Sequence, residues 1–106
     1  MKLVIAIINK DDCDGVIAEL SANGHSVTRL TSSGGFLRAG NSTILVGTED
    51  EKVDDVCAII KAKSHARTQL HVTTPFFSDI LVAQPIEVTI GGATIFVVDV
   101  DRWEKV

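Results

Sequence analysis

The sequence lacks the segments that would send a chain into or across a membrane. None of its apolar stretches is long enough to span a bilayer. Near the start, a six-residue apolar run ends in Asn9, Lys10 and two aspartates, where a signal peptide would have a small-residue cleavage site. We therefore expect a cytoplasmic location and no membrane partner.

Cysteine, clustered positive charge and paired metal ligands are also scarce. Cys13 and Cys57 both fall on apolar helical stripes, which favours buried, reduced thiols over a disulfide. A net charge of −4 without a basic run gives no support for binding a nucleic-acid polymer. The other soft ligands, His25, His65 and His71, lack the paired spacing of a metal site. We expect no bound metal.

No catalytic constellation is recognisable either. Acids such as Asp79, Glu87, Asp99 and Asp101 are present, but no nucleophile or base accompanies them at a recognisable spacing. What the 106 residues do contain is a 45% apolar fraction, ample for one domain that spans residues 1–106. We expect a protein that is not an enzyme.

The first half of the chain alternates strand and helix patterns. Residues 3–8 form a continuous apolar run, typical of a central strand covered on both faces. Asp11 or Asp12 is the expected N-cap of a helix that stops at residues 23–24. Its apolar stripe, at spacing i, i+3, i+4 and i+7, consists of Cys13, Val16, Ile17 and Leu20.

The same order then recurs. Residues 25–33 and 42–47 have strand patterns, and Thr48 with Glu51 matches a capping box before a second helix. Lys61 and Lys63 lie in its last turn, where the helix dipole favours cations. The second stripe consists of Val53, Val56, Cys57 and Ile60.

This half-repeat predicts an α+β fold, a ferredoxin-like βαββαβ sandwich with both helices on one face of an antiparallel sheet. Residues 69–72 are the expected start of the closing strand. Residues 86–90 and 93–100 have strand patterns joined by Gly91-Gly92, which predicts an additional C-terminal β-hairpin strand. Between them, residues 73–85 are irregular but apolar, so we expect this segment to cover another surface or meet a neighbouring subunit.

Residues 31–47 are the strongest candidate for a binding segment. Glycines there permit a close approach of ligand to backbone, Phe36 offers a flat face and Arg38 offers a fork of donors. No acid occurs between Glu19 and Glu49, and none from residue 61 to 78. Because these windows hold five cations, we expect both to face an anionic partner in one cleft between subunits. These cations are Arg29, Arg38, Lys61, Lys63 and Arg67.

Three segments together resemble the PII-like bacterial receptors for cyclic di-AMP. They are TSSGGFLRAGNSTILVG at 31–47, VDDVCAIIK at 53–61 and PIEVTIGGATIFVVDVDRW at 85–103. The resemblance implies a ferredoxin-like, PII-like protomer, a homotrimer and three ligand sites at the subunit interfaces. It also implies a non-catalytic signal-transduction receptor that takes cyclic di-AMP as ligand, has no cofactor, and changes loop conformation for an unknown effector protein.

Matched position by position, the family motif assigns one half of the site to residues 28–47. Thr28 meets an adenine edge, Phe36 stacks on or flanks the purine, and Leu37 closes it in. Gly35 and Leu37 present backbone groups, Asn41 forms a side-chain hydrogen bond, and Gly47 leaves space. The guanidinium of Arg38 pairs with a phosphate, or with Asp99 or Glu87.

The other half is expected from the neighbouring subunit, through Gly91-Gly92-Ala93 and Phe96. Trp103 and the aromatics of residues 76–77 are interpreted as core or interface hydrophobes. The chain departs from the family pattern just before Thr28, where residues 24–26 are Gly-His-Ser instead of larger or basic residues. That departure bears on ligand affinity.

Two alternatives remain open. A PII-like sensor of ATP or ADP is disfavoured by the short connection after the second strand and by the lack of a lysine-rich phosphate loop. A metal-binding trimer resembling the copper-tolerance proteins shares this fold, but the histidine and cysteine spacing gives it little support.

Overall fold

The computed structural model describes residues 1–30, 40–73 and 84–106. Four predicted site residues, Gly35, Phe36, Leu37 and Arg38, lie outside these ranges, as does most of the irregular segment 73–85 with both its phenylalanines. The elements run in the order β1 (Lys2–Asn9), α1 (Lys10–Ala22), β2 (Val27–Leu30), β3 (Asn41–Thr48), the 3-10 turn η1 (Asp50–Lys52), α2 (Val53–Ser64), β4 (Arg67–Thr73), β5 (Gln84–Ile90) and β6 (Ala93–Asp99).

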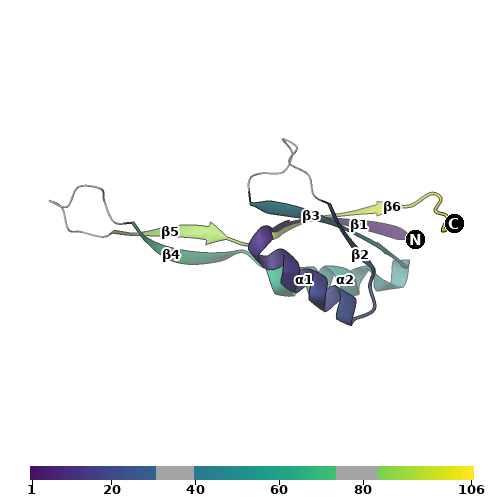
Figure 1. Cartoon of the computed structure of the whole chain (residues 1–106), viewed down its shortest axis with the longest axis horizontal. Coiled ribbons are helices and arrows are strands. Elements are labelled where there is room, and N and C mark those ends of the chain that lie inside the picture. The colour runs from purple at the N-terminus through teal and green to yellow at the C-terminus, as the bar shows by residue number, and fades with distance from the viewer. Residues whose placement is uncertain (31–39, 74–83) are drawn as a thin grey trace.

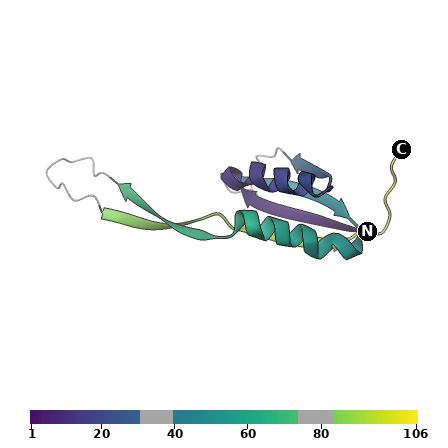
Figure 2. The same cartoon turned by 90° about the horizontal axis from the view of Figure 1, so that it is seen from below.

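Four of the strands form one antiparallel sheet in the order β2-β3-β1-β6. Both helices cover the same face of this sheet (Figure 1) and lie side by side beneath it (Figure 2). The ferredoxin-like βαββαβ prediction is confirmed, with β1 at the centre.

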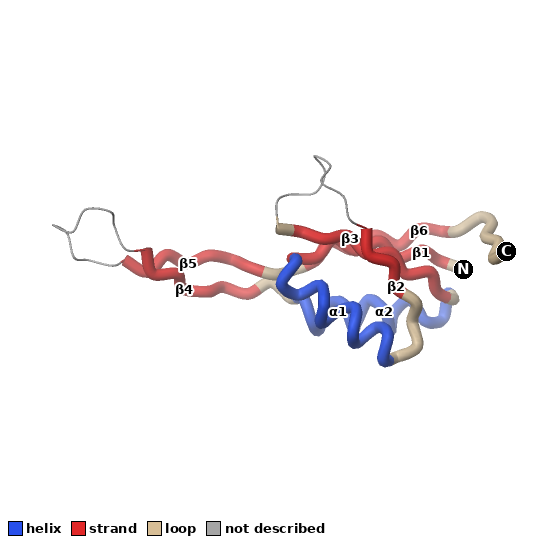
Figure 3. The backbone as a smooth tube through the Cα atoms, viewed as in Figure 1, coloured by secondary structure: helices blue, strands red, loops and turns tan. Residues whose placement is uncertain are grey.

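The closing strand is not the one predicted. Residues 69–72 do fall in a strand, β4, but β4 pairs only with β5 in a separate two-stranded ribbon. The fourth strand of the main sheet is β6, which pairs with β1 from Lys2↔Asp99 to Ile8↔Ala93. The β4–β5 ribbon extends away from the sheet and helices (Figures 1 and 3).

The predicted hairpin across Gly91-Gly92 is also wrong, because β5 and β6 belong to different sheets. A diglycine permits a sharp change of direction but does not choose a strand's partner. Here β5 pairs with β4 over seven positions, while β6 takes the free edge of β1 over seven. Both glycines have positive φ, 76° and 84°, and the backbone changes direction at this point as it passes from the ribbon into the main sheet.

The core lies between the helices and the sheet, and both predicted helical stripes contribute to it. Of the residues whose burial is described, ten apolar side chains there have no exposed surface, and each valine, leucine or isoleucine among them contributes about 1.5–3 kcal/mol by burial. They are Val4, Ala6 and Ile8 from β1; Ile44 and Val46 from β3; Cys13, Val16 and Leu20 from α1; and Val56 and Ile60 from α2. Ile17 packs partly buried against them.

The helix starts differ from the predictions. The N-cap of α1 is Asn9, not Asp11 or Asp12, and its side chain accepts a hydrogen bond from the Asp11 amide at 2.9 Å. This happens because β1 runs directly into the helix, so its last residue is already at the cap. Thr48 is paired with Lys2 at the end of β3, and neither η1 nor α2 has a side-chain cap, so the capping box with Glu51 does not form.

The other ends of the helices agree with the sequence. Helix α1 stops at Ala22, and the Asn23 amide donates to the Glu19 carbonyl at 3.2 Å. Lys61 and Lys63 occupy the last turn of α2. Within the described ranges, neither helix combines the length and apolarity that a bilayer crossing requires.

Candidate functional site

The sheet face opposite the helices, called the open face below, carries apolar side chains that the described residues leave partly bare. Side chains alternate along a strand, so the neighbours of buried Val4, Ala6 and Ile8 point to this face. We predicted from the sequence that both faces of β1 would be covered, but the described chain covers only the face toward the helices. The open face includes Leu3, Ile5 and Ile7 of β1, Leu45 of β3, Leu30 (40% exposed) of β2, and Phe96 (45%) and Val98 (43%) of β6.

One end of this face is hollowed. The hollow, of about 470 Å³, contains two predicted ligand residues, Thr28 and Gly47, and we call it the Thr28 hollow. A Cβ added at Gly47 would meet nothing within 4 Å, so the glycine leaves room there. The full lining is Met1, Leu3, Ser26, Thr28, Leu45, Gly47, Val100 and Trp103.

A second, smaller hollow lies at the other end of β1. It measures about 180 Å³ and is lined by Ile7, Asn41, Gly91, Gly92, Ala93 and Thr94; we call it the Asn41 hollow. Four predicted ligand residues therefore share one place within a single protomer. The register explains this, because Asn41 pairs with Asn9 and Ala93 with the adjacent Ile8, on either side of the end of β1.

Thr28 and Phe96, by contrast, are kept apart. They stand in one row across the sheet, in which Thr28 pairs with Leu45, Leu45 with Ile5, and Ile5 with Phe96. Three steps at the usual strand spacing of about 4.8 Å place them about 14 Å apart, on opposite edges of the sheet. A single protomer cannot bring these two predicted ligand residues onto one purine.

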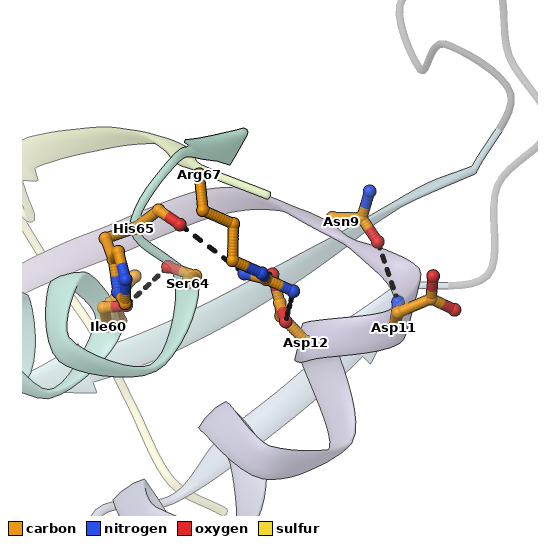
Figure 4. A network of polar contacts seen from close by, with 7 residues as sticks. All are labelled: Asn9, Asp11, Asp12, Ile60, Ser64, His65 and Arg67. Carbon is orange, nitrogen blue, oxygen red and sulfur yellow. Dashed lines mark hydrogen bonds and ion pairs between the residues drawn. The ribbon is translucent and has the colours of Figure 1, made fainter. Parts of the chain in front are cut away.

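The backbone around the Asn41 hollow is tied to the start of α1. The Lys10 amide donates to the Gly40 carbonyl at 2.7 Å, which fixes the point where the chain re-enters β3. On the other side, Arg67 of β4 meets Asp12 of α1 through two hydrogen bonds, Nη2 to Oδ1 at 3.0 Å and Nη1 to Oδ2 at 3.2 Å (Figure 4). Asp12 is only 10% exposed, and this bond raises the pKa of the Arg67 guanidinium.

Gly91 packs directly onto that ion pair. A Cβ at this position would lie 2.6 Å from Nη1 of Arg67 and 2.9 Å from the His65 carbonyl oxygen. Together with its positive φ, this close contact explains why a glycine occupies the base of the ribbon. The Asp12–Arg67 pair thus positions the diglycine that lines the Asn41 hollow.

Arg29 and Arg67, two cations of the acid-free windows, both have acidic partners in the described chain. Arg29 pairs with Asp14 of α1 at 2.8 Å, from Nη1 to Oδ1, and Arg67 pairs with Asp12. A window drawn along the sequence contains no acids, but helix α1 supplies both of them in space. Lys61 lines a third hollow of about 390 Å³ with Ser64, His65, Ala66, Gly92, Ala93 and Ile95, beside the end of α2.

The stretch before Thr28 divides its side chains between two environments. Nε2 of His25 lies 3.0 Å from Oδ2 of Asp55, and its side chain is 6% exposed against α2. Ser26 lines the Thr28 hollow. Ser26, Leu3, Leu45 and Trp103 also line this hollow and were not predicted as ligand residues. The alternation of side chains along β1 and β3 is the signal that could have identified the two leucines.

Comparisons with known proteins agree with the sequence resemblance. A family model described as "Cyclic-di-AMP receptor" matches residues 1–106. A crystal structure of a functionally unknown protein from Pediococcus pentosaceus ATCC 25745 is 38% identical, with a TM-score of 0.77. The match covers 99% of this chain and 96% of that one.

Proposed function

Because the chain belongs to the cyclic-di-AMP receptor family, we propose that it is a non-catalytic receptor that binds cyclic di-AMP between the subunits of a homotrimer. Residues 1–106 act as one PII-like domain in this proposal. The observation that carries it is the separation of Thr28 and Phe96 on opposite edges of one face. A site in which both residues meet the same purine needs two protomers.

The apolar open face supports the assembly. Exposed patches of this kind usually mark interfaces, because burial of apolar surface is the main driving force for association. In a ring, each subunit uses two different patches, one for each neighbour. The β2 edge of one protomer then faces the β6 edge of the next, and the three open faces cover one another.

The two hollows suit the two kinds of group in cyclic di-AMP. The Thr28 hollow combines a leucine floor with a hydroxyl, which fits a purine ring and its polar edge. The Asn41 hollow offers an amide side chain and the backbone of two glycines with positive φ, an arrangement in which peptide N–H groups can approach a phosphate closely. Asn41 and Gly91-Gly92-Ala93 therefore hold the sugar-phosphate part, while Thr28 and Gly47 admit adenine.

The segment between β2 and β3 completes the site in this proposal. Gly35 and Leu37 supply backbone groups, Phe36 stacks on the purine, and Arg38 meets a phosphate. Since β2 ends at Leu30 and β3 starts at Asn41, this segment joins the two strands that carry Thr28 and Asn41. Ligand binding changes its conformation, and an effector protein reads the altered surface.

Calorimetric titration of the purified protein with cyclic di-AMP tests the proposal, with cyclic di-GMP and ATP as controls. We expect saturation near one ligand per protomer, selectivity for cyclic di-AMP and affinity around the micromolar range, about −8 kcal/mol. Asn41→Ala should weaken binding, whereas Lys63→Ala, on the last turn of α2 and away from both hollows, should not. Absence of heat with cyclic di-AMP would contradict the proposal.

A further inference from the structure

The wall of the Thr28 hollow includes a residue with no assigned part in binding. Trp103 lies in the C-terminal tail that follows β6, and its side chain is 59% exposed. It is the only tryptophan of the chain, which has no tyrosine. A large aromatic left this bare, beside a recess, has free surface to offer a ligand.

The tail is held at the hollow by the backbone. The Val100 amide donates to the Met1 carbonyl at 3.2 Å, which continues the β1–β6 pairing beyond Asp99. Val100 itself lines the same hollow. Trp103 follows three residues later, so its position beside the recess is set by the end of the sheet.

The composition of the hollow matches a flat heterocycle. Leu3 and Leu45 form an apolar floor from adjacent strands, Thr28 supplies a hydroxyl, and Gly47 leaves its side free of atoms. Its volume of about 470 Å³ lies within the range of about 300–1,000 Å³ typical of ligand pockets. Among the described residues that line the hollow, Trp103 alone offers an aromatic face, on which a purine can stack.

We propose that Trp103 stacks on the adenine whose edge meets Thr28, and so forms part of the binding site. This inference rests on the proposed function and adds a residue to it. It revises the sequence interpretation, which treated Trp103 as a core or interface hydrophobe.

The chain carries its own probe for the test. With a single tryptophan and no tyrosine, fluorescence excited at the red edge of indole absorption reports Trp103 alone. Titration of wild-type protein with cyclic di-AMP should change this fluorescence with the same dissociation constant as calorimetry gives. Calorimetric binding without any change in fluorescence would overturn the stacking role while leaving the proposed receptor function intact.

Three tail variants complete the experiment. Trp103→Ala should weaken binding by about fivefold to a hundredfold, the range for loss of one base stack, and Trp103→Phe should weaken it less. Val106→Ala, in the same exposed tail, is the matched control and should bind like the wild type. Light scattering should give all three variants the mass of the wild-type assembly.

Three further outcomes decide against the inference. Wild-type affinity in Trp103→Ala would remove the stacking role, and so would a Trp103→Ala protein of lower mass than the wild type, which would assign the indole to a subunit contact. A wild-type protein that binds no cyclic di-AMP by calorimetry would overturn the proposed function, and this inference with it.

Discussion

Both faces of the main sheet are rich in apolar residues, but the helices cover only one of them. On the helix side, Val4, Ala6 and Ile8 of β1 have no exposed surface. On the open side, Leu3, Ile5 and Ile7 of the same strand are only half-buried by the described residues. The same strand therefore has apolar residues on both faces, and the described chain fully buries only those on the helix side.

This difference separates stability of the protomer from its function. The helix face accounts for folding, because the helices bury its apolar β1 and β3 residues; among the described residues, its β6 edge is left uncovered at Val97 (44% exposed). The open face carries Thr28 and Gly47 and the Phe96 edge, and we propose that it is completed only by neighbouring subunits. Substitutions on the helix face should therefore impair folding, whereas substitutions on the open face should impair assembly and ligand binding.

The largest contrast is expected from lysine substitutions on the two sides of β1. Ile8→Lys places an unpaired charge in the core and should prevent folding, because burial of an isolated ammonium is strongly unfavourable. Ile5→Lys, on the open face, should leave the protomer folded but block assembly and cyclic di-AMP binding. Circular dichroism and light scattering on both variants distinguish these results; an Ile5→Lys protein that remains trimeric would contradict the role given to the open face.

Gly91 lies at the junction between the β4–β5 ribbon and the main sheet, and its substitution tests how that junction is held. Gly91→Ala should lower the free energy of unfolding by about 1–3 kcal/mol, because it combines a positive φ with a Cβ only 2.6 Å from Arg67 Nη1. Cyclic di-AMP binding should also weaken, since the diglycine lines the Asn41 hollow.

Gly15→Ala is the matched control for Gly91→Ala. Gly15 lies within α1, and a Cβ there would meet nothing within 4 Å. The substitution should raise the free energy of unfolding by about 0.5–1 kcal/mol through helix propensity. Urea denaturation of both variants measures the contrast, and equal signs would refute the account of the junction.

The Asp12–Arg67 pair should matter for binding more than its exposed counterparts. Arg67→Ala leaves Asp12, 10% exposed, without its partner, and should lower stability and weaken ligand binding through the displaced Gly91-Gly92. Arg102→Ala removes an exposed pair with Glu104 and should change stability by less than about 1 kcal/mol. Equal effects in denaturation and titration would mean that Arg67 does not position the diglycine.

The smallest expected effect concerns the thiol on the covered face. Burial raises the pKa of Cys13 above its ordinary value of 9.0, with Arg29 and Ser42 acting in the opposite direction. Because the folded protein holds this proton more tightly, the stability it contributes is fully present below the ordinary pKa and is lost as pH rises through the higher folded value.

Thiol labelling checks this prediction near pH 8. Half-buried Cys57 should react with a thiol reagent well before buried Cys13. Cys57→Ser should therefore remove the fast phase and leave only the slow one. A fast phase that survives in Cys57→Ser would contradict the burial assigned to Cys13.

Periodicity predicted the part of the fold that burial organises. Both helical stripes and the central position of β1 follow from the spacing of apolar residues, which fixes the covered face. The partner of a strand is a different matter. Gly91-Gly92 indicates a turn, but whether β6 pairs with β5 or with β1 depends on which sheet edge is free.

The prediction of site residues was limited in the same way, because contacts between segments distant in sequence cannot be read from local patterns. The family motif named residues that fall into two hollows of the open face, whereas the charge windows did not show the acidic partners of Arg29 and Arg67. Those two cations lie against Asp14 and Asp12, which are distant in sequence and adjacent in space. Trp103 was interpreted as a core or interface hydrophobe, because nothing in the local sequence shows that the end of β6 runs beside Leu3 of β1 and Leu45 of β3.

The central claim is that each ligand site combines the Thr28 edge of one subunit with the Phe96 edge of the next. Thr28→Asp and Phe96→Ala should each bind cyclic di-AMP poorly as pure trimers. Co-expressed, they should form mixed trimers in which one of the three interfaces carries both native residues, as a ring with two different patches per subunit requires. Calorimetry of the mixed trimers should recover wild-type affinity at that fraction of sites, whereas mixed trimers with no wild-type sites would contradict the account.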